Sequence, residues 1–245
     1  VIAFAIELYE RGILTDKDTG GIKLRWGDPD LVIDLIEMIA KREGFGDVMA
    51  EGTIYLARKY KAEDLAVHVR GLDFVMHDPR AFPSLGLSYV TTPKGPDHTS
   101  FTQSIERGIL IPELGIDKPV DRYDLNGKAA FVKKMQDYMG LFDSLVICKF
   151  LLHSGVSPSL IAESLSAITG WNIDIEWMLK TGERIFNLKR IYNYKCGIGT
   201  RKFDILPKKI MTPFKEGGAK GKIPDLDKLL PEYYKERGWD ENGIP

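Results

Sequence analysis

The chain has 245 residues, of which 44% are hydrophobic, so it can bury a substantial core and could form two domains. Its 34 basic and 35 acidic residues nearly cancel, which gives no reason to expect a nucleic acid or a membrane surface as partner. Two cysteines are too few for a disulfide framework, so a reducing cytoplasm is the expected compartment.

The first seventy residues predict helices. An amphipathic helix is expected over 1–12, closed by Gly12, and charged residues interrupt its apolar run well before a membrane-spanning length. Asp28-Pro29 marks the next start, with a capping carboxylate and proline at the first helical position, and that helix should run to Gly44. A further helix is predicted from about Asp47 to Tyr60.

The middle of the chain is less regular. Residues 67–72 and 74–75 read as extended, the only convincing strand-like region. From Asp78 to Pro119 glycine, proline and small polar residues predict irregular structure with one helix near 85–92. Long irregular stretches in compact proteins often carry function.

Helices dominate again in the last part, over 126–141, over 158–169 with Ser157 as cap, over 174–194, and over 225–237. The predicted fold class is therefore mainly α, with little strand and a soft boundary near 70–80. Because the sequence starts without methionine inside an apparent helix, we expect it to be the C-terminal part of a longer or split polypeptide.

Asp143-Ser144-Leu145-Val146-Ile147-Cys148 offers the most chemistry. It places a carboxylate five residues before one of the two cysteines. A thiolate binds soft metals, but no second ligand lies nearby, so most of a coordination sphere would have to come from other polypeptide. By residue type alone, Cys148 favours a core position, because free cysteine is among the most buried residues. Cys196 has no ligand-like neighbour and is interpreted as structural.

Among the four histidines, His98 stands out. It lies in the polar loop Pro93–Ser100, where an imidazole could donate or relay a proton near neutral pH, although a surface histidine is an equal alternative. His77 is expected to pack at a loop, and His153 to face Ser154 or a helix end. Asp78-Pro79-Arg80 reads either as a turn or as an arginine held to meet an anion.

Four stretches in order resemble the tungsten-dependent aldehyde ferredoxin oxidoreductase family, and the resemblance covers essentially the whole chain. The stretches are Ala3–Gly12 with Leu24–Asp28, Arg42–Gly52, Asp143–Phe150 and Glu232–Asp240. The third is similar to the family's Asp-x-x-Gly-Leu-Cys element. The resemblance implies two helical domains. Residues 1–72 would be the C-terminal part of the family's second domain, and residues 73–245 would be its third domain. The β-rich N-terminal cofactor domain would be absent.

The resemblance also implies site residues. Asp143 would contact a pterin of the tungsten cofactor, and Ile147 would also be a cofactor-binding residue. Cys148 would be the fourth ligand of a [4Fe–4S] cluster. A carboxylate fork matches the adjacent N–H donors of a pterin, and thiolate is the ligand of iron–sulfur clusters. His98 would be the catalytic histidine. The sequence departs from the family at Val146 and Ile147, where glycine and leucine are usual, and this affects the backbone geometry beside the pterin.

The implied activity is oxidation of an aldehyde to a carboxylic acid, with a tungsten bis-pterin (molybdopterin-type) cofactor and ferredoxin as electron acceptor. The other expected partners are the missing N-terminal portion of the protein and the aldehyde substrate, and the enzyme could form a homodimer. This stretch alone should be inactive. Two alternatives remain open. One is the tungsten subunit of a benzoyl-CoA reductase-like enzyme, and the other is a cofactor-free helical interaction module.

Overall fold

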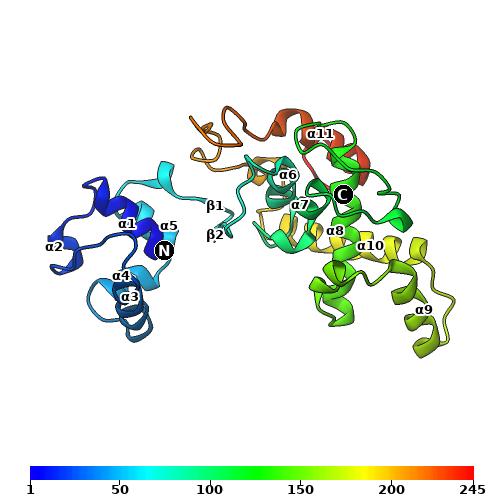
Figure 1. The fold of residues 1–245 in the computed structure, drawn as a ribbon, viewed down its shortest axis with the longest axis horizontal. Coiled ribbons are helices and arrows are strands. Elements are labelled where there is room, and N and C mark those ends of the chain that lie inside the picture. Colours follow the sequence, from blue (N-terminus) through cyan, green and yellow to red (C-terminus); the bar gives the residue numbers. More distant parts are fainter. The chain divides into compact units, whose positions relative to one another are not determined.

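The computed structural model describes residues 1–245, and it confirms the mainly α fold class (Figure 1). Its contacts divide the chain into two compact units. Unit 1 comprises Val1–Val67 with Pro207–Lys209, and unit 2 comprises His68–Leu206 with Ile210–Pro245. The assignment of 1–72 and 73–245 to the second and third family domains stays a prediction. No helix combines the length and the apolar character needed to cross a bilayer.

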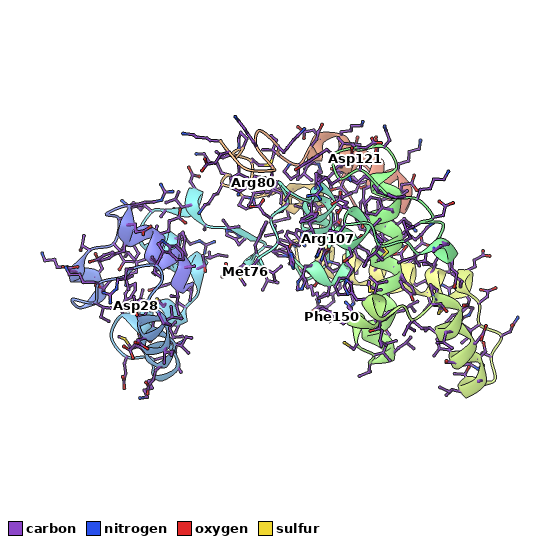
Figure 2. All side chains as sticks on the ribbon, in the orientation of Figure 1. Asp28, Met76, Arg80, Arg107, Asp121 and Phe150 are labelled. Atoms are coloured by element: carbon purple, nitrogen blue, oxygen red, sulfur yellow. The ribbon has the colours of Figure 1, made fainter.

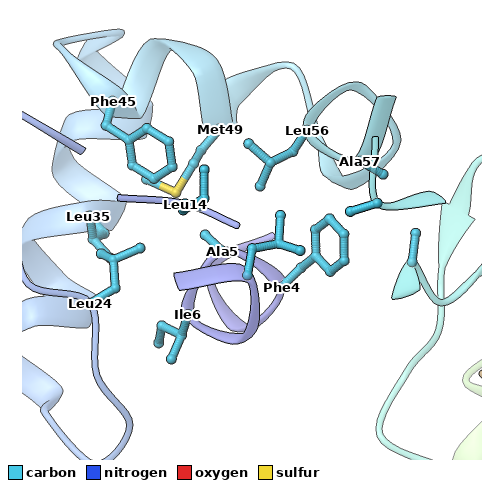
Figure 3. Packing of buried hydrophobic residues seen from close by; sticks show 13 residues of the cluster. Phe4, Ala5, Ile6, Leu14, Leu24, Leu35, Phe45, Met49, Leu56 and Ala57 are labelled. Atoms are coloured by element: carbon cyan, nitrogen blue, oxygen red, sulfur yellow. The ribbon is translucent and has the colours of Figure 1, made fainter. Parts of the chain in front are cut away.

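Unit 1 is a small helical body. Its elements are α1 (Ile2–Glu10), α2 (Asp16–Thr19), α3 (Pro29–Lys41), α4 (Phe45–Ala50), α5 (Thr53–Lys59) and the 3₁₀ turn η1 (Glu63–Leu65). Apolar side chains from α1, α3, α4 and α5 meet in one core (Figure 3), which includes Phe4, Ile6, Leu35, Met49 and Leu56. Gly46 lets α4 approach α3, because a Cβ there would lie 2.3 Å from the Met38 carbonyl carbon.

The local signals of unit 1 have mixed outcomes. The start of α3 is confirmed, since the Asp28 carboxylate accepts the Leu31 N–H at 3.0 Å and proline occupies the first turn. The single helix predicted over 47–60 is wrong. Gly52 has φ +88°, outside the helical region, and it separates α4 from α5.

Unit 2 holds the remaining elements. They are β1 (His68–Val69), β2 (Leu72–Asp73), α6 (Pro83–Thr91), η2 (His98–Ser100), α7 (Thr102–Glu106), η3 (Pro112–Leu114), α8 (Lys128–Leu145), η4 (Lys149–Ser154), α9 (Pro158–Thr169), α10 (Ile175–Lys195), η5 (Arg201–Phe203) and α11 (Leu226–Arg237). The long helix α8 is central, since α6, α10 and α11 all pack against it.

The strand-like region is a short hairpin. β1 and β2 pair antiparallel, with Val69 opposite Leu72. Arg70 and Gly71 at its turn both have positive φ, +49° and +96°, as a type I′ turn requires. The extended assignment of residues 74–75 is wrong, because the strand ends at Asp73.

Helix α10 packs closely on α8 at a glycine. A Cβ on Gly182 would lie 2.0 Å from the Asp137 carbonyl oxygen, so only glycine allows this separation. Gly140, one turn further along α8, faces the Gly182 carbonyl oxygen, with 3.9 Å between that oxygen and a Cβ built at Gly140. The two helices therefore meet backbone to backbone beside the C-terminal half of α8.

Helix α11 is joined to α8 by buried polar groups. Arg237 is buried, and its guanidinium pairs with the Asp137 carboxylate and donates to Gln136 Oε1 at 3.0 Å. Tyr233 donates its hydroxyl to the same Gln136 oxygen at 2.6 Å. A buried charge retained in this way needs its partners, so these bonds determine where α11 lies on α8.

Several helix starts of unit 2 are confirmed, and some boundaries are wrong. Ser157 caps α9 as predicted, and Asp174 and Asp225, predicted as the first residues of their helices, cap α10 and α11. The irregular segment after Asp78 contains α7, which was not predicted. Helix α8 ends at Leu145 instead of 141, so its last turn includes Asp143.

Candidate cofactor-binding and catalytic site

The predicted cofactor element lies at the C-terminal end of α8. The helix stops at Val146, whose φ of +56° and ψ of +36° are left-handed. The chain then turns, and the Ile147 N–H donates to the Phe142 carbonyl at 3.1 Å. This turn separates Asp143, in the last helical turn, from Cys148, which precedes η4.

Both polar groups of this element are accessible. The Asp143 side chain is 46% exposed, and Cys148 is exposed. The interpretation of Cys148 as a core residue is therefore wrong. Its neighbours alternate between exposed and half-buried, because the chain leaves α8 at the surface of the unit. Cys196 is also a free, exposed thiol.

Lys149 connects this element to the loop that contains His98. Its Nζ lies 3.0 Å from Asp143 Oδ2 and 3.4 Å from Thr99 Oγ1. Asp97 caps the His98 turn, accepting the Thr99 N–H at 2.9 Å and the Thr99 hydroxyl at 2.6 Å. The structure thus brings the predicted catalytic loop next to the predicted cofactor element, 45 residues later in the sequence.

The electrostatics of the loop favour an ionised Asp97. Burial opposes ionisation of this carboxyl, but the hydrogen bonds from Thr99 and the Lys94 ammonium, 3.0 Å away, outweigh that cost and lower its pKa. The anion in turn holds the Thr99 amide, so the turn that presents His98 has a charge-assisted anchor.

Two other side-chain rings lie near the His98 imidazole. The His77 ring lies 5.0 Å from it, centroid to centroid, with 32° between the planes, and the buried Phe101 ring lies 6.5 Å away, edge-on. The Phe101 ring also lies 4.7 Å from the His153 ring and 5.3 Å from the Phe150 ring, centroid to centroid, and Phe150 is 57% exposed. Burial, then the nearby His98, then Arg107 lower the pKa of His77.

The other histidines and Arg80 have mainly structural contacts. His153 Nε2 lies 3.1 Å from Ser104 Oγ, so it faces α7 and not Ser154. Arg80, labelled in Figure 2, pairs with Asp78 at 2.6 Å and donates to the Thr212 carbonyl at 2.8 Å. The turn interpretation of Asp78–Arg80 is therefore the one that fits, since protein acceptors engage this guanidinium.

A cavity of about 550 Å³ opens between α8, α10 and the His98 loop. Its polar lining includes Asp97, Asp143, Lys149 and Lys189, and its apolar wall comes from α8 and α10. The cavity is large enough for a small organic cofactor or substrate, and ligand sites of this kind combine an apolar wall with a few polar groups.

Comparisons with known proteins identify the family of the chain. The sequence model of the family described as "Aldehyde ferredoxin oxidoreductase, domains 2 & 3" matches residues 1–245. The chain belongs to this family. Among its relatives, the tungsten-containing aldehyde ferredoxin oxidoreductases of Pyrococcus furiosus and Pyrococcus abyssi are 38% and 37% identical to it, over 99% of this chain and 40% of each relative.

One further relative and one solved structure also match the chain. An "aliphatic sulfonate oxidoreductase, WOR-like subunit" of Pyrococcus furiosus is 34% identical over 100% of this chain and 38% of its own length. Among solved structures, the active-site complex BamBC of benzoyl coenzyme A reductase matches with a TM-score of 0.68, over 100% of this chain and 41% of that chain, at 22% identity. That likeness shows a shared fold. The chain spans about 40% of the length of the tungsten relatives it matches.

The residues present are suited to the cofactors that the aldehyde ferredoxin oxidoreductase family implies. The Asp143 carboxylate lines a cavity, where it can accept paired N–H donors, and the Cys148 sulfur is open to a ligand. No three His, Cys, Asp or Glu side chains of this chain converge on one point. A cluster at Cys148 would thus take its other ligands from outside this chain.

Sequence reasoning missed Lys149, the pairing of His77 with His98, and the cavity. Lys149 directly follows Cys148, so its position in the family element could have drawn attention to it. The pairing of His77 with His98 and the cavity wall from α10 had no local signal, because both depend on how distant segments pack.

Proposed function

We propose that this chain is the C-terminal part of a tungsten-pterin, iron–sulfur oxidoreductase that oxidises aldehydes to carboxylic acids and passes the electrons to ferredoxin. One observation carries the proposal. Asp143 on the cavity wall, the exposed Cys148 and the His98 loop meet at the end of α8, in a chain 38% identical to a tungsten-containing aldehyde ferredoxin oxidoreductase.

Each residue has a role in this proposal. Asp143, together with the Ile147 segment, holds the pterin, and the Cys148 thiolate completes a [4Fe–4S] cluster. When bound, the tungsten cofactor would supply Lewis acidity and an electron-accepting centre, and the cluster would supply a one-electron carrier. The chain's own part is to place these groups and to control water and protons.

His98 handles protons. Conversion of an aldehyde and one water into a neutral carboxylic acid releases two electrons and two protons. An imidazole can accept a proton at a ring nitrogen near neutral pH, and it can hold a carbonyl oxygen by donating an N–H. The Asp97 cap positions the His98 turn, and the buried Phe101 ring limits water on one side of the imidazole.

The remaining parts of the enzyme lie outside this chain. The other three cluster cysteines, a second pterin-binding aspartate and a catalytic glutamate would come from an N-terminal portion of the same protein. Ferredoxin would dock on the assembled enzyme, which could be a homodimer. The cytoplasm suits this assignment, since both cysteines here are free thiols.

Metal analysis of the full-length protein tests the cofactor assignment. The wild type should contain tungsten and four irons per cluster, and Cys148→Ser should lose iron and the visible absorbance of the cluster. Cys196→Ser is the matched control, because Cys196 is also an exposed free thiol and should leave iron unchanged. Unchanged iron in Cys148→Ser would refute the assignment. A full-length protein without either metal would support the cofactor-free module instead.

Product analysis tests the reaction. His98→Ala should lower kcat for aldehyde oxidation by about 10²- to 10⁴-fold, the usual contribution of general acid–base catalysis, while metal content stays near normal. Wild-type turnover in that variant would remove His98 from the mechanism. The same enzyme should be offered an aromatic acyl-CoA thioester and an aliphatic sulfonate. Turnover of one of these without aldehyde oxidation would replace the aldehyde proposal.

A further inference from the structure

The Lys149 side chain contacts two separate elements of unit 2. Its side chain is 12% exposed, and its ammonium lies between two acceptors, Asp143 Oδ2 at 3.0 Å and Thr99 Oγ1 at 3.4 Å. The two acceptors belong to different elements, the last turn of α8 and η2. Lys149 therefore forms a bridge between the predicted cofactor residue and the predicted catalytic loop.

A second lysine near the same carboxylate forms no such bridge. Lys189, from α10, comes within 4.0 Å of Asp143 Oδ2, and its side chain is 49% exposed. Both lysines place a positive charge beside Asp143, but Lys149 alone of the two also contacts Thr99. The two positions thus separate a charge effect from a positional one.

The loop side of the bridge leads to His98. Thr99 is the next residue and is bound twice by Asp97. The His98 carbonyl accepts the Phe101 N–H at 2.9 Å and the Gln103 Nε2 at 3.2 Å. These bonds hold the peptide group between His98 and Thr99, so a shift of Thr99 also displaces the backbone that carries the imidazole.

We propose that Lys149 is a positioning residue that couples Asp143 to the His98 loop, so that the cofactor-binding carboxylate and the catalytic imidazole keep a constant separation. This inference rests on the proposed function of Asp143 and His98. Lys149 acts through these two residues and contacts no reacting atom itself. Because small displacements of catalytic groups reduce rates strongly, the bridge should be visible in turnover.

The test compares Lys149→Met with Lys189→Met in the full-length holoenzyme. Methionine keeps most of the aliphatic stem and removes the ammonium in both variants. Hydrogen exchange, read by mass spectrometry on peptides covering 96–104, reports on the loop independently of activity. Tungsten and iron contents, kcat and KM for an aldehyde are measured on the same preparations.

Lys149→Met should raise amide exchange in 96–104 and lower kcat about tenfold or more, with metal content kept. Lys189→Met should leave amide exchange in 96–104 within about twofold of the wild type, because Lys189 does not contact Thr99, and it should lower kcat less than Lys149→Met does, because it removes only a positive charge beside Asp143. Lys149→Arg, which retains the charge and several donors, should recover most of the lost kcat, and it keeps the test valid if the methionine variant fails to fold.

Equal changes in the two methionine variants would show a charge effect only and overturn the proposal. Wild-type exchange and turnover in Lys149→Met would overturn it as well, and so would loss of tungsten without any change in loop exchange. These results are distinct from failure of the proposed function. That failure would appear as absence of tungsten, or of aldehyde oxidation, in the wild-type enzyme.

Discussion

Val146→Gly should stabilise unit 2. Val146 ends α8 with φ +56° and ψ +36°, and its side chain is 90% exposed. A β-branched residue is strained in this left-handed region, whereas glycine adopts it freely at a helix C-terminus. The family's usual glycine at this position thus has a conformational explanation at the helix end, in addition to any contact with a pterin.

The magnitude follows from two opposing terms. Relief of the left-handed conformation is worth about 1–2 kcal/mol. Glycine makes the unfolded chain more flexible, which offsets about 0.4–1 kcal/mol of this gain. The exposed isopropyl group buries little area, so its removal costs little. The free energy of unfolding should therefore rise by about 0.5–1 kcal/mol, or roughly 1–4 °C in Tm.

Urea unfolding followed by tryptophan fluorescence can measure this change, because Trp239 is buried in unit 2. Leu188→Gly is the control. Leu188 is also exposed, at 69%, but it lies in the middle of α10, where glycine should cost about 0.5–1 kcal/mol. A Val146→Gly variant that loses stability, as Leu188→Gly should, would show that the left-handed strain argument is wrong.

Three other predictions concern buried or paired charges. Arg237→Met should lower the free energy of unfolding by about 2–4 kcal/mol, because it leaves Lys133 as the only ion-pair partner of the buried Asp137 and removes a donor to Gln136 Oε1. A urea midpoint near that of the wild type would contradict this. The lowered pKa of Asp97 gives stability that is complete well above pH 3.8 and is lost as pH falls through the lowered value. The protection of the amides in 96–104, measured relative to their intrinsic exchange rates at each pH, should therefore fall in acid, and Asp97→Asn should abolish this pH dependence. His98→Ala should raise the pKa of His77, since His98 is one cause of the lowering of that pKa. The pKa can be measured from the exchange of the imidazole C2 hydrogen, read by mass spectrometry. An unchanged pKa of His77 would refute the interaction.

The helix starts show what local sequence can establish. Asp28, Ser157, Asp174 and Asp225 were predicted as caps or helix starts, and each accepts the N–H of the residue three positions later. Such bonds join neighbours in the chain, so the residue types alone predict them. Interruptions within helical stretches and short helices were harder to predict. Gly52 and the short helix α7 depend on local geometry that periodicity does not reveal.

By itself, the sequence determined the mainly α class, most helix starts and the chemical types of the candidate site, a carboxylate, a thiol and an imidazole in a family element. Only the tertiary structure decided that Cys148 is exposed, that Lys149 lies between Asp143 and the His98 loop, and that α8 and α10 form one wall of a cavity. The physical reason is the sequence separation over which each kind of interaction acts. Capping and amphipathic patterns act within a few residues, whereas these arrangements depend on contacts between segments tens of residues apart, which form only when helices pack.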